Sequence, residues 1–295
     1  RDRMEPSKDY IFNHKGFYFG TKLTTAEHID SLETFEIRNS DVFIVTFPKS
    51  GTVWTQNILS LIMHEGHRNG TENIQNMDRI PWLEYNVKNM DYSALPSPRV
   101  FATHLPYYLT PRDLRNKRAR VIYVARNPKD VLVSYFHYSK IMTTIEQVPD
   151  FNLFMERFLA GKVLGSSWLD HVTGWYSHAQ DFNILFLTYE EMKKDLQSAV
   201  LKICNFLGRK LSEKEVESVV RQATFENMKK DPRANYEKLP GYIKEDKQSH
   251  FLRKGTIGDW KNIMTVAQSE RVDEVLKKKL ENLPINFIWD MNDQV

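Results

Sequence analysis

Short apolar runs alternate with amphipathic stretches along this chain, and their order predicts its secondary structure. Residues 41–46 (Asp-Val-Phe-Ile-Val-Thr) and 119–125 (Ala-Arg-Val-Ile-Tyr-Val-Ala) are runs typical of buried strands, and residues 183–187 predict a third. After the first run, residues 53–64 carry apolar side chains at positions 54, 58, 61 and 62, which is the stripe of an amphipathic helix. The chain therefore reads as strand, loop and helix in succession.

Helix boundary signals support the same reading further along. Asn127 and Pro128 follow the second strand and suit an N-cap and a first helical position. Residues 190–207 predict one helix that ends at Gly208, and residues 212–215 (Ser-Glu-Lys-Glu) form a capping-box signature. Strands that alternate with helices predict an α/β fold, with a central parallel sheet flanked by helices on both faces. Ligands of such sheets bind beyond the carboxyl ends of the strands.

Composition narrows the class of protein. The chain has 295 residues, 41% apolar and 12% aromatic, which suits one sizeable core. Residues 1–3 precede Met4 and read as an added remnant, so we expect a single domain over residues 4–295. No run of about 18 apolar residues and no secretory leader are found, so a cytosolic protein without a membrane span is expected.

The counts of charged residues and cysteines exclude further classes. Lys and Arg number 41 against 38 Asp and Glu, a near balance that favours a small anionic ligand over a nucleic acid. The single cysteine, Cys204, can form neither an internal disulfide nor a cysteine metal cluster, and its helical context favours burial. No set of carboxylates is arranged for magnesium, so no metal is expected.

The loop after the first strand is the first candidate site. Residues 48–52 (Pro-Lys-Ser-Gly-Thr) join a strand to a helix, so free backbone N–H groups and the positive helix end point to one place. Gly51 permits a close approach, Thr52 offers a hydroxyl and Lys49 adds a cation. The lysine precedes the glycine, unlike in the nucleotide-triphosphate P-loop. Alone, this motif suits an ordinary helix start equally well.

Three motifs in order change that picture: Pro-Lys-Ser-Gly-Thr-x-Trp at 48–54, Arg-Asn-Pro-Lys-Asp-Val-x-Val-Ser-Tyr at 126–135, and Arg-Lys-Gly-x-x-Gly-Asp-Trp-Lys-Asn at 253–262. Together they resemble the cytosolic sulfotransferase family, and residues 55–62 and 103–108 are most similar to its amine sulfotransferase subfamily. The resemblance implies the P-loop-like sulfotransferase fold. It also implies transfer of a sulfuryl group from 3′-phosphoadenylyl sulfate (PAPS) to a small amine, arylamine or phenol, which leaves adenosine 3′,5′-bisphosphate (PAP).

The resemblance also implies a role for individual residues. His104, at the end of the strand segment 99–104, would be the base, Lys49 would steady the oxygen between sulfur and phosphorus, and Ser134 would hold Lys49 aside. The phosphosulfate would lie on residues 48–54, and the 3′-phosphate on Arg126, Ser134 and residues 253–255. The cofactor-binding set is Lys49, Ser50, Gly51, Thr52, Val53, Trp54, Arg126, Ser134, Tyr189, Phe225, Met228, Arg253, Lys254 and Gly255.

The acceptor side and the partners are less sharply defined. Trp82, Tyr85 and Tyr138 match positions of an apolar acceptor pocket, although plain core packing would explain them equally well. The resemblance further implies a weak homodimer through a short segment that includes Lys261, Thr265, Val266 and Glu270. Residues 231–249, rich in charge, are a candidate lid.

Three departures from the family pattern leave alternatives open. Ala102 stands where a lysine is frequent, Val53 replaces a frequent threonine, and Ala223 replaces a threonine near the adenine. A steroid or alcohol acceptor is one alternative, and a catalytically idle PAPS-binding protein is another. A small-molecule kinase is a third, which the position of Lys49 disfavours.

Overall fold

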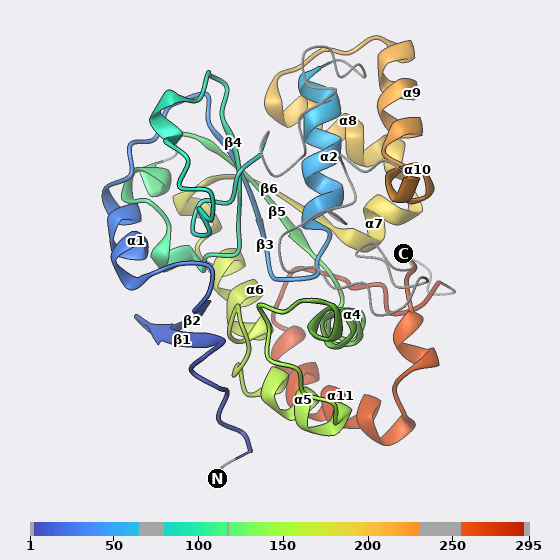
Figure 1. Cartoon of the computed structure of the whole chain (residues 1–295). Coiled ribbons are helices and arrows are strands. Elements are labelled where there is room, and N and C mark those ends of the chain that lie inside the picture. Colours follow the sequence, from blue (N-terminus) through green and yellow to red (C-terminus); the bar gives the residue numbers. More distant parts are fainter. Residues whose placement is uncertain (1–2, 65–79, 117, 231–254, 292–295) are drawn as a thin grey trace.

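Four parallel strands form the central sheet (Figure 1). The computed structural model describes residues 3–64, 80–116, 118–230 and 255–291. The strands are β3 (Val42–Thr46), β4 (Val100–Thr103), β5 (Arg120–Ala125) and β6 (Asn183–Thr188), arranged β4-β3-β5-β6. An antiparallel hairpin, β1 (Ile11–His14) and β2 (Phe17–Gly20), precedes them. The predicted parallel sheet is confirmed.

The helices connect these strands and cover them. The α-helices are α1 (Ala26–Ser31), α2 (Thr52–Met63), α4 (Pro128–Ile141), α5 (Phe151–Leu159), α6 (Trp168–Ser177), α7 (Tyr189–Lys194), α8 (Leu196–Leu207), α9 (Glu213–Gln222), α10 (Phe225–Lys230) and α11 (Val266–Leu280). Short 3₁₀ helices are η1 (Leu32–Thr34), η2 (Tyr92–Ala94), η3 (Tyr107–Leu109), η4 (Arg112–Asn116), η5 (Ala179–Asp181) and η6 (Asp259–Asn262).

Alternate residues of the strands enter two separate cores, one on each face of the sheet. In β3, Ile44 belongs to the core shared with α2, α8 and α9, whereas Phe43 and Val45 belong to the core shared with α4, α5 and α6. The same division in β5 separates Ile122 from Tyr123. Because both faces are buried, the strands read as continuous apolar runs. Figure 1 shows α2 and α9 on one side of the sheet and α4, α5 and α11 on the other.

Local signals gave several helix boundaries correctly. Asn127 caps α4 by accepting from the N–H of Asp130, Pro128 occupies its first turn, and residues 212–215 form the capping box of α9. Gly208 ends α8 in the left-handed region at φ +68°. Cys204 is buried, as expected.

The single helix predicted over residues 190–207 is wrong, because the chain breaks at Asp195. This residue has φ −145° and ends α7, and its side chain accepts from the N–H of Ser198 to cap α8. An aspartate that bonds to a nearby backbone N–H competes with a continuous helix. The apolar face continues across the break, which is why periodicity alone did not reveal it.

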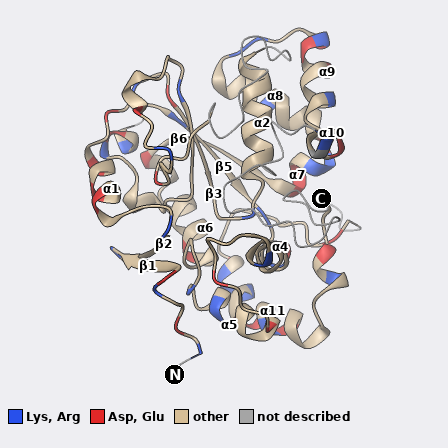
Figure 2. Ribbon diagram, in the orientation of Figure 1, with Lys and Arg blue, Asp and Glu red and all other residues tan. Residues whose placement is uncertain are grey.

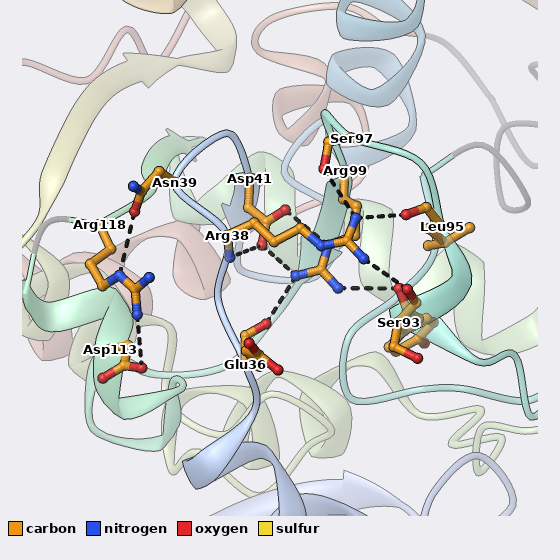
Figure 3. A network of polar contacts seen from close by, with 11 residues as sticks. Glu36, Arg38, Asn39, Asp41, Ser93, Leu95, Ser97, Arg99, Asp113 and Arg118 are labelled. Carbon is orange, nitrogen blue, oxygen red and sulfur yellow. Dashed lines mark hydrogen bonds and ion pairs between the residues drawn. The ribbon is translucent and has the colours of Figure 1, made fainter.

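The end of the sheet where β3 and β4 begin is fixed by a buried ion pair (Figure 3). Arg99 Nε and Nη2 donate to the two carboxylate oxygens of Asp41 at 2.9 and 2.6 Å. The other Arg99 donors bind the carbonyl oxygens of Tyr92 and Glu36, and Arg38 N donates to Asp41 at 2.8 Å. Every nitrogen of this guanidinium is therefore paired.

Several sequence-based predictions concern residues that the structure does not describe. Residues 1–2, the candidate lid at 231–249, and Arg253 and Lys254 lie outside the described residues. The domain limits of 4–295 stay a prediction. Within the described ranges, no helix is long and apolar enough to cross a membrane. Figure 2 shows basic and acidic residues interspersed along outer helices such as α5, α9 and α11.

Candidate active site

One cavity lies at the end of the sheet where β3, β4 and β5 finish, and it brings together most of the predicted site. It spans about 990 Å³, including space open to solvent. The predicted residues that line it are Lys49, Gly51, Thr52, Val53, Trp54, Trp82, His104, Arg126, Ser134, Tyr138, Tyr189, Phe225 and Gly255. They come from seven separate stretches of the chain, residues 49–54, 82, 104, 126–138, 189, 225 and 255, so the fold assembles the site from distant parts of the sequence.

Of the predicted site residues that the structure describes, three are not among those that line the cavity. Ser50 and Met228 are fully buried behind it, and the Ser50 hydroxyl has no hydrogen-bond partner. Tyr85 packs against the core on the other face, and its hydroxyl is likewise buried without a partner. An acceptor-lining role for Tyr85 therefore has no support from its position.

The loop between β3 and α2 has an unusual backbone. Lys49 and Gly51 both have positive φ, +66° and +85°. A Cβ at Gly51 would lie 2.8 Å from the Tyr189 ring, so glycine is required here by the aromatic neighbour as well as by the backbone. Gly51 caps α2 without a side-chain hydrogen bond. The first N–H groups of α2 are thus left for a ligand at the positive end of a 12-residue helix.

Arg126 holds this loop and retains unused donors. Its Nη1 donates to the carbonyl oxygen of Lys49 at 2.9 Å, and its guanidinium lies 4.2 Å from the Tyr189 ring centroid. The residue is only 8% exposed, yet Nε has no hydrogen-bond partner. A buried guanidinium with an unpaired N–H is costly unless an anion binds it, so the geometry fits an anion site.

His104 is held as a neutral imidazole. Its Nδ1 lies 2.7 Å from the carbonyl oxygen of Thr46, so Nδ1 carries the proton and Nε2 carries the lone pair. Burial lowers the His104 pKa to about 3, opposed by the Thr46 hydrogen bond and reinforced by His171 and Lys49. Nε2 is therefore unprotonated at neutral pH, which is one requirement of a general base.

Buried groups behind His104 fix its backbone. Glu84 Oε2 accepts from the N–H of His104 at 2.9 Å and from Thr103 Oγ1 at 2.7 Å, whereas Oε1 has no partner. Burial raises the Glu84 pKa to about 7. His171 Nε2 donates to the carbonyl oxygen of His104 at 2.9 Å. The sequence gave no signal for these supports, because they lie 20 and 67 residues from His104.

Several aromatic side chains line the part of the cavity where the PAPS nucleotide is expected. Trp54 and Tyr189 rings meet edge to face at 5.3 Å, and Trp54 Nε1 donates to the carbonyl oxygen of Ala223 at 2.7 Å. A Cβ at Gly255 would lie 2.5 Å from Phe225. Burial lowers the pKa of Lys193, whose ammonium lies 5.2 Å from the Phe225 centroid. These rings can sandwich a planar base.

Two further aromatic residues of the cavity, Trp82 and Tyr138, contact the proposed catalytic side chains. The Trp82 ring centroid lies 4.5 Å from that of His104, and Lys49 Nζ lies 4.4 Å from the Tyr138 centroid. The cavity is also lined by residues that were given no individual role from the sequence: His137, Ile141, Thr256 and Asp259. His137 and Ile141 follow Ser134 at helical spacing, which was the available signal for them.

Ala102 occupies a packed position. It is fully buried in β4, and its backbone pairs with residues 81–83, which bring Trp82 beside His104. Among the described residues, no group of three or more His, Cys, Asp or Glu side chains is placed to hold a metal ion.

A parallel α/β sheet with an anion loop after its first strand and a neutral histidine after the neighbouring strand defines a P-loop-like transferase. The chain belongs to the sulfotransferase family, since the family model described as a sulfotransferase domain matches residues 39–284. It is 54% identical over 293 residues to the amine sulfotransferase of Oryctolagus cuniculus, which covers 99% of this chain and 97% of the relative.

Two further relatives agree with this assignment. Sulfotransferase 2B1 of Rattus norvegicus is 41% identical over 280 residues, which cover 95% of this chain and 82% of the relative. The crystal structure of mouse sulfotransferase SULT7A1 complexed with PAP superimposes with a TM-score of 0.76 at 32% identity, covering 93% and 96% of the two chains.

Proposed function

We propose that this protein transfers the sulfuryl group of PAPS to a small acceptor, an amine, arylamine or phenol, and releases PAP. The acceptor nitrogen or oxygen forms the new bond to sulfur, and the bond from sulfur to the bridging phosphate oxygen breaks. The products are a sulfamate or a sulfate ester and PAP. PAPS is a substrate of this reaction, and no metal is included.

A single arrangement carries the proposal: the uncapped start of α2 and the unpaired Nε of Arg126 lie beside a cavity that also contains a neutral histidine. The uncapped start of α2 and Lys49 suit the phosphosulfate, and the unpaired Nε of Arg126 suits the 3′-phosphate. A donor nucleotide with two anionic ends would satisfy both. The PAP complex of the mouse relative supports the same ligand for this chain.

The two chemical roles follow from charge. His104 Nε2 takes the proton that the acceptor loses, because its lone pair stays available far below neutral pH. Lys49 supplies a cation for the oxygen that leaves sulfur. The Lys49 ammonium lies over the Tyr138 ring, so the acceptor wall and the catalytic cation are in contact. We retain Ser134, which lines the same cavity, as a residue that restrains Lys49.

An amine acceptor fits the pocket in its uncharged form. Lys49 repels an ammonium ion, whereas Trp82 and Tyr138 offer flat apolar faces. Arylamines are neutral at physiological pH, but alkylamines are largely protonated and have no lone pair for attack. The name of the amine sulfotransferase relative supports an amine as the acceptor.

The test is a transfer assay with PAPS and a panel of anilines, alkylamines, phenols and steroids, with products identified by mass. We expect sulfated arylamine and phenol. Preferential sulfation of steroids or alcohols would favour that alternative, and tight PAPS binding without any product would favour an idle binding protein.

We also propose a weak homodimer through the segment that contains Lys261, Thr265, Val266 and Glu270. Val266 is 76% exposed at the start of α11, where Thr265 is the N-cap. Sedimentation of wild type and Val266→Glu would test it, with a monomer expected for the variant. The cytosolic location stays a prediction from the sequence.

A further inference from the structure

A buried carboxylate lies next to the donor side of the cavity and has no part in the reaction just proposed. Asp130 is in the first turn of α4, four residues after Arg126, and is 3% exposed. Its Oδ2 accepts from the N–H of Gly258 at 2.9 Å, and its Oδ1 accepts from the N–H of Trp260 at 3.0 Å. These donors lie 128 and 130 residues further along the chain, so one side chain joins two distant segments.

The segment held by Asp130 is the one that brings Gly255 to the cavity. Gly255 packs directly on the Phe225 ring, with φ +59°. Gly258 has φ +85°, and a Cβ there would lie 3.1 Å from the Cα of Asp290. The turn is thus enclosed on both sides and presents its N–H groups to Asp130.

Lys129, the neighbour of Asp130, holds the same region from its outer side. Its Nζ donates to Ser269 Oγ of α11 at 2.8 Å and lies 4.5 Å from the ring centroid of Trp260. An ion pair with Asp273 of α11 at 2.9 Å completes this contact. The first turn of α4 therefore binds the 258–260 turn and α11 together.

The other side of Arg126 is anchored in a comparable way. The N–H of Asn127 donates to Glu190 Oε1 at 2.5 Å, and Glu190 directly follows Tyr189, on which Arg126 stacks. Arg126 is thus fixed to α7 on one side. On the other side, the contacts of Lys129 and Asp130 described above join the start of α4 to Gly258 and Trp260 of the 255–260 segment.

We infer that Asp130 is a positioning residue that fixes the 255–260 segment against Arg126 and thereby completes the site for the 3′-phosphate. This inference rests on the proposed function, because it presupposes that a 3′-phosphorylated nucleotide binds here. Asp130 does not touch the nucleotide. It sets the distance between two parts of the chain that do.

Chemistry requires a carboxylate at this position. Both oxygens of Asp130 accept hydrogen bonds, and Oδ2 accepts a second one, from Asn127 Nδ2 at 2.7 Å. Asparagine has the same shape, but its NH₂ would face an N–H donor and leave it unpaired. The turn should then move away from α4, which weakens contacts to the 3′-phosphate and spares those to the 5′ end.

The experiment compares two nucleotides on full-length protein by calorimetry. PAP carries the 3′-phosphate and adenosine 5′-monophosphate lacks it, so the ratio of their dissociation constants reports the 3′ site alone. For Asp130→Asn we expect PAP binding to weaken about tenfold and 5′-monophosphate binding to change by less than about twofold. The KM for PAPS should rise, with kcat at saturation nearly unchanged.

Two further variants keep the test decisive. Gly258→Ala disturbs the same contact from the other segment. It should raise the ratio of the PAP dissociation constant to the 5′-monophosphate constant to a similar extent, which matters if Asp130→Asn fails to fold. Glu146→Gln is the matched control, because Glu146 also ties a distant segment, through the N–H of Ser7 and through Arg157, away from this cavity. Its ratio should equal that of the wild type.

The possible outcomes distinguish a failure of the inference about Asp130 from a failure of the proposed function. Equal losses for both nucleotides, or an unchanged ratio in both Asp130→Asn and Gly258→Ala, would overturn the inference and leave the proposed function intact. A wild type that binds both nucleotides equally would overturn the proposed 3′-phosphate site and this inference with it.

Discussion

The two ends of the sheet contain buried arginines that differ in one respect. Where the strands begin, Arg99 has every nitrogen paired, two of them with the Asp41 carboxylate (Figure 3). Where the strands finish, Arg126 is almost as buried but leaves Nε without a partner. A saturated guanidinium fixes the scaffold, whereas an unsaturated one is available to a ligand. Hydrogen-bond pairing therefore distinguishes the structural end of the sheet from the proposed ligand-binding end.

The largest expected effect is on stability at the saturated end. Asp41→Asn removes the charge that pairs with Arg99 and leaves a buried cation, so the free energy of unfolding should fall by about 3–5 kcal/mol. Urea unfolding would measure this change. PAP affinity of the folded fraction should equal that of the wild type, and a selective loss of PAP binding would break the comparison.

At the open end, His104→Ala should lower kcat roughly 100- to 1000-fold, because the reaction loses its base. PAP affinity and the melting temperature should change little. His14→Ala, on the β1–β2 hairpin, serves as a control with normal turnover. Near-normal turnover of His104→Ala would show that another group accepts the proton.

Two buried groups, Glu84 and His104, should differ in how they respond to pH. The Glu84 carboxyl has an ordinary pKa of 4.5 when unfolded and about 7 when folded, so the folded state binds more protons between these values. Glu84 thus lowers the free energy of unfolding as pH rises from about 4.5 to 7, by on the order of 2 kcal/mol.

Glu84→Gln should remove this contribution while its oxygen keeps the hydrogen bonds to Thr103 and His104. Urea unfolding of both proteins between pH 4.5 and 7 would measure the difference in slope. Parallel curves would contradict the assignment. Because burial lowers the His104 pKa to about 3, kcat/KM for a phenol should show no loss near pH 6.5 caused by this histidine.

The smallest expected effect is on the acceptor wall. Tyr138→Leu removes the ring beneath Lys49 Nζ and should lower kcat/KM for an arylamine about tenfold. Tyr138→Phe keeps the ring and should stay within about twofold of the wild type. Steady-state kinetics would measure both, and equal losses would assign the effect to the hydroxyl instead.

Features encoded by neighbouring residues could be predicted from the sequence. The buried strands, the cap at Asn127 and the capping box at residues 212–215 depend on a few adjacent positions, and each is confirmed. The break at Asp195 was missed because a capping side chain overrode an uninterrupted apolar face. The family motifs gave most residues of the cavity.

Contacts between distant segments could not be predicted. Arg126 binds the Lys49 carbonyl across 77 residues, and Asp130 binds Gly258 across 128. No local pattern states which backbone group a buried side chain will meet, because the fold brings the partners together. The same holds for Tyr189 beside Gly51 and for Glu84 beneath His104.

The most direct measurement is the affinity of Arg126→Ala for PAP, compared with adenosine 5′-monophosphate, by calorimetry. The account predicts that PAP binding weakens roughly 10- to 100-fold and that 5′-monophosphate binding weakens much less, without the loss of stability predicted for Asp41→Asn. A variant that binds PAP as tightly as the wild type would contradict it.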